Sequence, residues 1–266
     1  MYFYCREPVE VSSRIGYEQL RSAMYRAKRQ RMDIIPQSLE DLAVMLGQPN
    51  NRRFVRTLDD HPFYLGHVSN EGSSSVIFGS HHFIQLMEEA HEVHIDGTFK
   101  VRPNVPPSRQ LLTVMTMHFS QAFPVFYVLM ESKSSSSYIA LFRFLRDVAP
   151  QFNPTVVITD FERGLQVAVR TVFPNAHLVG CWFHSANAMR KRARLLGMTA
   201  LLNENPVAHK IVKMTMSLPL LPHDAIPAGM RAIRQHALRN GLAEEMERFL
   251  LYVEETWIQG KLNIFL

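Results

Sequence analysis

The sequence places two aspartates where metal-dependent chemistry would need them. Asp96 ends one apolar run, and Asp160 ends another that covers residues 156–159. Functional residues of open sheets gather at strand ends, and two carboxylates on neighbouring strands could bind hard, oxygen-seeking cations. Two such cations about 4 Å apart stabilise both the attacking and the leaving oxygens of a phosphodiester. The competing interpretation is that each aspartate merely caps the element that follows it.

Hydrophobic periodicity from Ser80 onward predicts the elements that would position these aspartates. A helix over 80–90 is followed by the order β-β-β-α-β-α-β, with strands expected at 93–96, 111–118, 124–130, 156–159 and 176–181. Ser137 is expected to cap the helix between the third and fourth strands. Three closely spaced antiparallel strands continued by βαβ units form a mixed sheet with helices on its faces. The sequence therefore predicts an α/β fold.

The flanking regions have a different pattern. Residues 1–79 are predicted to hold a basic amphipathic helix (17–31), a helix from the N-cap Ser38 to Gly47, and a hairpin around residues 70–73. After Trp182 the chain is predicted to be helical, with breaks at residues 205–206, 219–222, 227 and 240–241. We therefore divide the chain into an N-terminal region (1–79), an α/β core (80–194) and a helical region (195–266).

Net charge, cysteine content and the length of apolar runs limit the kinds of protein that this sequence could encode. The formal net charge is +5, which suits a polyanionic partner without requiring one. Two cysteines, Cys5 and Cys181, exclude a disulfide framework and fit a reducing compartment such as the cytosol or nucleus. No apolar run reaches the roughly 18 residues of a membrane helix, and the N-terminus lacks the apolar core of a signal peptide. We therefore expect a soluble intracellular protein.

Five ordered motifs add a family resemblance. They are His94–Lys100, Gln110–Thr113, Phe123–Val125, Val157–Glu162, and Phe173–Ala176 followed by Gly180–His184. Together they resemble the transposase domain of Mutator-like elements (MULE) over residues 80–194. The resemblance implies a ribonuclease H-like fold with a DDE catalytic triad, Mg²⁺ or Mn²⁺ as cofactor, transposon-end DNA as partner and a nuclear location. The resemblance leaves open whether the protein forms a homo-oligomer. Asp96 and Asp160 match the first two acids and would be catalytic metal ligands.

The third acid does not match. The family places it after a helical insertion, downstream of a Tyr…Thr-Trp motif that Tyr252 and Thr256-Trp257 resemble. The sequence ends at Leu266 before such an acid, and Glu254 and Glu255 precede the tryptophan. We therefore expect an all-helical insertion that is incomplete at its C-terminus, as in a fragment, a mis-spliced gene product or a decayed copy. A DDE-type enzyme is implied by resemblance only.

Cys181 and His184 form a Cys-x-x-His that resembles a family signature. Two ligands cannot complete a tetrahedral zinc site, which needs four. We expect His184 to orient a phosphate or the carboxylates and Cys181 to pack at a strand end. The alternative is a buried cysteine beside a core histidine.

Basic side chains could bind the DNA backbone. The run Arg190, Lys191, Arg192 and Arg194, and a second run at 26–31, would contact phosphates, unless they are simply solvated faces. Trp257 either stacks on an unpaired base or belongs to the core of the insertion. The leading hypothesis is a MULE-type DNA transposase. The alternatives are a domesticated or decayed DNA-binding relative without catalysis, and a different ribonuclease H-like nuclease.

Overall fold

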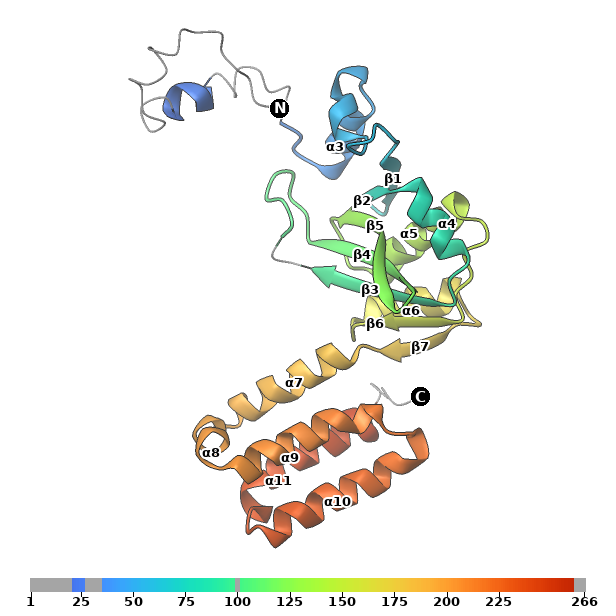
Figure 1. The fold of residues 1–266 in the computed structure, drawn as a ribbon. Coiled ribbons are helices and arrows are strands. Elements are labelled where there is room, and N and C mark those ends of the chain that lie inside the picture. The colour runs from blue at the N-terminus through green and yellow to red at the C-terminus, as the bar shows by residue number, and fades with distance from the viewer. Residues whose placement is uncertain (1–20, 27–34, 99–100, 261–266) are drawn as a thin grey trace.

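A computed structural model describes residues 21–26, 35–98 and 101–260 of the chain. Figure 1 shows a sheet unit and a helical unit, joined by the long helix α7 (Trp182–Leu195). Of the basic helix predicted over 17–31, residues 21–26 are helical, and the other residues lie outside the described part. Cys5, Lys100 and most of the 26–31 run also lie outside it.

The sheet is mixed and has seven strands in the order β1-β2-β5-β4-β3-β6-β7. The strands are β1 (Tyr64–Asn70), β2 (Ser73–Gly79), β3 (Glu92–Thr98), β4 (Gln110–His118), β5 (Gln121–Met130), β6 (Val156–Thr159) and β7 (His177–Gly180). Strand β3 pairs antiparallel with β4 and parallel with β6, which pairs parallel with β7. The predicted mixed α/β class is confirmed. The predicted hairpin forms as β1 and β2, and it extends the sheet because β2 pairs with β5.

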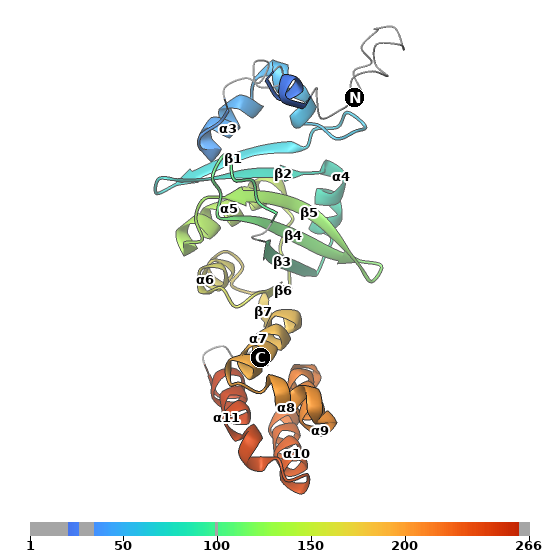
Figure 2. The ribbon, with the colours of Figure 1, turned by 90° about the vertical axis from the view of Figure 1, so that its left-hand side faces the viewer.

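Helices cover both faces of this sheet. In Figure 2, α4 (His81–Glu88) lies on one side and α5 (Ser135–Val148) and α6 (Arg163–Val172) lie on the other. The predicted cap of α5 was wrong: the cap is Ser134, whose hydroxyl accepts the backbone N–H of Ser137. At the N-terminal side, α3 (Leu39–Leu46) begins at a Ser38 capping box and ends at Gly47, as predicted, and the 3₁₀ helix η1 (Pro49–Phe54) follows.

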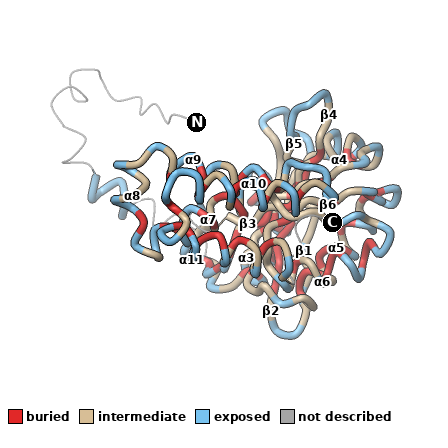
Figure 3. Tube along the Cα trace, turned by 90° about the horizontal axis from the view of Figure 1, so that it is seen from below, coloured by how far each residue is buried: buried red, intermediate tan, exposed pale blue. Residues whose placement is uncertain are grey.

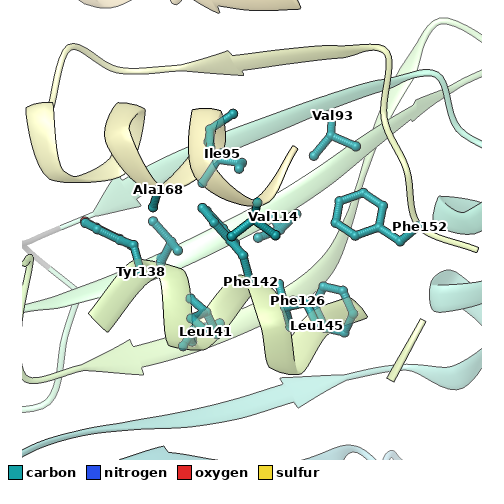
Figure 4. Close-up of a cluster of buried hydrophobic side chains, with 14 of the residues drawn as sticks. Val93, Ile95, Val114, Phe126, Tyr138, Leu141, Phe142, Leu145, Phe152 and Ala168 are labelled. Carbon is teal, nitrogen blue, oxygen red and sulfur yellow. The ribbon is translucent and has the colours of Figure 1, made fainter. Parts of the chain in front are cut away.

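The main core lies between the sheet and the pair α5 and α6. Figure 4 shows Val93 and Ile95 of β3 directed into the same cluster as Phe142 of α5 and Ala168 of α6. All four side chains are buried. Successive side chains of a strand point to opposite faces, so Asp96, which follows Ile95, is directed away from this core.

The C-terminal helices form a core of their own, and Figure 3 shows buried segments along these helices. They are α8 (Thr199–Glu204), α9 (Pro206–Ser217), α10 (Ile226–Arg239) and α11 (Ala243–Val253), with the 3₁₀ turns η2 (Leu218–Leu220) and η3 (His223–Ala225) and a π-helical turn, η4 (Glu254–Ile258). Most predicted breaks are confirmed. Pro227 is not one, because it occupies the first turn of α10, where no N–H is required. None of the described helices could cross a membrane.

Candidate active site

Strand register brings the two predicted aspartates to one level of the sheet. In the parallel pair of β3 and β6, Ile95 is the partner of Thr159, and Asp96 and Asp160 are the next residues. Neighbouring strands lie about 4.8 Å apart, so the two aspartates are direct neighbours. Strand β7 adds Cys181 at the same level, where its backbone N–H donates to the Thr159 carbonyl at 2.7 Å.

His184 lies beside these carboxylates. Cys181 is the N-cap of α7, and His184 occupies the first turn, with its Nε2 3.5 Å from Asp96 Oδ1. The positive charge of protonated His184 also lowers the pKa of Asp160, although other effects outweigh it. Asp96 Oδ1 and His184 Nδ1 are both buried and have no hydrogen-bond partner among the described residues. The site thus combines two carboxylates, an imidazole and polar atoms whose bonding capacity is unused.

Asp160 is held in an environment that disfavours its charge. Burial is the main cause of its raised pKa, and the nearby Glu162 carboxylate adds to the rise. The backbone N–H of Glu162, which donates to Asp160 Oδ1 at 3.0 Å, works in the opposite direction, as do His184 and Lys133. Burial removes the water that would stabilise the anion, so the neutral form of Asp160 is favoured. A cation bound beside Asp160 would favour the charged form instead.

A buried polar network supports the Asp160 loop. Glu162 forms an ion pair with Lys133 and accepts a 2.7 Å hydrogen bond from the Tyr138 hydroxyl. Gln110 Nε2 in turn donates to the Tyr138 hydroxyl oxygen at 2.6 Å, and Gln110 and Tyr138 are both fully buried. Sequence reasoning missed this network. The only feature of the sequence that pointed to this network was Glu162, which lies two residues after Asp160.

Gly164 allows the first turn of α6 to approach the loop before α5. A Cβ atom at this position would lie 2.5 Å from the Lys133 carbonyl oxygen, closer than atoms can pack. The close approach places Lys133 against Glu162. Glycine is therefore required here by the backbone of a neighbouring segment.

The helical unit also reaches the site. Phe161, between Asp160 and Glu162, packs edge to face on Trp257, with ring centroids 5.0 Å apart. Trp257 is 3% exposed and belongs to the helical core, so it fits the interpretation as a core residue and not the one as a base-stacking residue. Glu254 is engaged by Arg234, whose Nη2 lies 2.6 Å from Glu254 Oε2, and Glu255 is exposed.

The predicted basic run divides between two sides of α7. The Arg192 guanidinium stacks over the Tyr252 ring at 5.1 Å, so it joins α7 to α11. Arg190 and Arg194 line a cavity that α7 shares with α9. Lys191 is exposed. The run is therefore not a single surface.

The described residues fit a divalent cation in part. Asp96 and Asp160 provide two adjacent carboxylates, and the buried Asp96 Oδ1 accepts no hydrogen bond from the described residues, although His184 Nε2 lies 3.5 Å from it. Within the described ranges, however, no three His, Cys, Asp or Glu side chains are grouped to hold an ion. These residues would thus supply part of a coordination shell.

Comparison with known families agrees with the sequence motifs. The family model of the MULE transposase domain matches residues 92–188. The matched segment runs from the start of β3 into α7 and includes Asp96, Asp160, Cys181 and His184. The resemblance inferred from the sequence is thereby confirmed for this segment. None of the curated proteins compared with the chain matches it.

Proposed function

We propose that this chain carries the catalytic core of a metal-dependent DNA transposase, with Asp96 and Asp160 as metal ligands. The observation that supports this best is the parallel register of β3 and β6, which makes the two aspartates neighbours. The strand order β5-β4-β3-β6-β7, with three antiparallel strands followed by two parallel ones, supports a ribonuclease H-like assignment for this part of the sheet.

Each residue of the site has a part in this proposal. Asp96 and Asp160 would hold a divalent cation, which would supply Lewis-acid activation of water or a 3′-hydroxyl and charge stabilisation for the leaving oxygen. His184 orients the Asp96 carboxylate, which its Nε2 faces at 3.5 Å. Glu162 fixes Asp160 through its backbone N–H, while its own carboxylate is occupied by Lys133 and Tyr138. Two carboxylates leave a cation under-coordinated, so we expect weak metal binding and slow cleavage.

Metal binding by purified protein tests the proposal directly. Mn²⁺ titration calorimetry should give a weak, saturable signal for the wild type and none for Asp96→Asn or Asp160→Asn. Asp147→Asn is the matched control, because Asp147 is an exposed acid on α5 away from the site. With Mn²⁺, the wild type and Asp147→Asn should cleave a fluorescent DNA duplex slowly, and Asp96→Asn and Asp160→Asn should not cleave it.

Two outcomes would count against the proposal. Unchanged Mn²⁺ binding in both site variants would show that these carboxylates are not the ligands. DNA binding by a wild type that neither binds Mn²⁺ nor cleaves would favour a transposase-derived DNA-binding protein.

A further inference from the structure

A basic cavity of about 560 Å³ opens between α7, α8 and α9. Its polar lining residues are Arg190, Arg194, Thr199, Asn203, His209 and Lys213. We propose that this cavity, the α7–α9 groove, binds backbone phosphates of the DNA strand that enters the candidate active site. The inference builds on the proposed function and gives that site a defined path for its substrate.

The charged side chains that line the groove are all basic. Arg190 and Arg194 are four residues apart on α7, and His209 and Lys213 are four residues apart on α9, so each pair shares one face of its helix. The four side chains are exposed, and no aspartate or glutamate lines the cavity. Over the described residues, none of the four forms a salt bridge. Cationic groups gathered in a concave site attract a polyanion.

The groove is fixed relative to the carboxylates. The Trp182 indole N–H, at the start of α7, donates to the Met216 carbonyl of α9 at 2.7 Å, and Met216 lines the groove. The first turn of α7 also carries His184, which contacts Asp96. One helix therefore connects the site and the groove, and Figure 1 shows α7 running from the sheet unit toward α8 and α9.

The distance along α7 defines which phosphates would be bound. At a rise of about 1.5 Å per residue, Arg190 and Arg194 lie about 9 Å and 15 Å beyond His184 along the helix axis. One DNA strand advances about 3.4 Å per nucleotide. The groove would thus hold phosphates about three to four nucleotides from the one at the carboxylates. Three cationic side chains on two facing walls, Arg190 and Arg194 opposite Lys213, suit successive phosphates of a strand better than one small anion.

The test compares DNA affinity at several salt concentrations, using a short fluorescent duplex and the 266-residue chain. Arg190→Ala/Arg194→Ala and Lys213→Ala should weaken binding, on the order of tenfold for the double variant, and lower the salt slope by about 0.9 for each phosphate that is no longer neutralised. Lys210→Ala is the matched control on α9, since Lys210 is exposed but does not line the groove. It should bind like the wild type.

A second control removes two charges elsewhere. Arg231→Ala/Arg239→Ala takes two exposed arginines from α10 and should leave the slope unchanged. Far-ultraviolet circular dichroism and melting curves confirm that each variant is folded.

The groove and the metal site can fail separately. The groove proposal would be refuted if the groove variants kept the wild-type salt slope of DNA binding. It would also be refuted if Lys210→Ala weakened DNA binding equally. Either result would hold even if Mn²⁺ still binds at Asp96 and Asp160. A wild type that binds no duplex would overturn it too. Stabilisation by inorganic phosphate that disappears in the double variant, with DNA affinity unchanged, would identify a small-anion site instead. Weaker DNA binding in the groove variants without any Mn²⁺ binding would support the groove and refute the metal site.

Discussion

Replacing Tyr138 by phenylalanine removes one hydroxyl from the centre of the polar network behind the candidate site. That hydroxyl donates to Glu162 Oε1 at 2.7 Å and accepts from Gln110 Nε2 at 2.6 Å. Burial, together with the neighbouring Glu162 carboxylate, raises the pKa of Tyr138 far above its usual range. The hydroxyl is therefore protonated and donates at every pH at which the protein would be studied.

The expected loss of stability follows from the partners left behind. A hydrogen bond to a charged acceptor contributes about 1.5–3 kcal/mol, and an unpaired buried donor costs about 1–3 kcal/mol. Glu162 keeps Lys133 and some access to water, while Gln110 Nε2 keeps only the weak acceptor Met130 Sδ at 3.2 Å. We therefore expect Tyr138→Phe to lower the free energy of unfolding by about 2–3 kcal/mol.

Urea unfolding followed by circular dichroism measures this change. Tyr127→Phe is the matched control, because it deletes the same atom from a half-buried tyrosine of β5. We expect the control to change the free energy of unfolding by less than about 0.5 kcal/mol. Mn²⁺ affinity should fall in Tyr138→Phe but persist, because Glu162 positions Asp160 through its backbone N–H.

Unfolding of Tyr138→Phe at the same urea concentration as Tyr127→Phe, with an unchanged slope, would refute a stabilising role for this network. The network would then be a consequence of the fold and would not help to stabilise it. A changed slope alone would indicate a different denatured state.

Three further substitutions test other contacts. Gly164→Ala places a Cβ 2.5 Å from the Lys133 carbonyl oxygen, so urea unfolding should show a loss of about 2 kcal/mol. Arg192→Ala removes the guanidinium from the Tyr252 ring and should lower stability by about 0.5–1 kcal/mol with an unchanged DNA salt slope. Asp160→Asn should abolish Mn²⁺ binding yet raise the melting temperature of the metal-free protein at pH 7, because burial raises the pKa of Asp160 and so penalises its anion. The gain should vanish as the pH falls through that pKa, where Asp160 becomes neutral.

Each of these predictions has its own control. Gly47→Ala meets only ordinary contacts at 3.5 Å and beyond, and its φ of −70° suits alanine, so it should be tolerated. Arg192→Lys keeps a cation near the ring and should retain part of the stability. A destabilised Asp160→Asn at pH 7 would mean that the missing attraction to His184 and Lys133 outweighs the relief from burial.

Local signals account for the elements that the sequence predicted. The buried face of α6, with Leu165, Ala168, Val169 and Val172, follows helical periodicity, and all four residues are buried as expected. The cap of α5 was missed because four consecutive serines can each cap a helix. The choice of Ser134 leaves the Ser137 hydroxyl 3.0 Å from that of Ser73 in the hairpin, which is a non-local contact. The pairing of β2 with β5 was missed because it, too, joins segments that are far apart in the sequence.

Only those residues of the candidate site that lie at the end of a predicted strand could be identified from the sequence. Asp96 and Asp160 carry that signal, but a buried glutamine in a strand and a tyrosine on a helix do not, so Gln110 and Tyr138 could not be recognised. The basic run shows a second limit. Helical residues advance by about 100° each, so Arg192 turns toward Tyr252 while Arg190 and Arg194 face α9. A cluster in sequence is therefore not a cluster in space.

The loop after β6 joins three parts of the molecule through three successive residues. Asp160 extends the strand whose last residue, Thr159, accepts the Cys181 N–H. Phe161 packs on Trp257 in the helical core, and Glu162 bonds to Tyr138 of α5. Because these contacts leave the loop in different directions, they determine its position together. The helical unit therefore contributes to placing Asp160, so loosening Trp257 should disturb the carboxylate site without touching either aspartate.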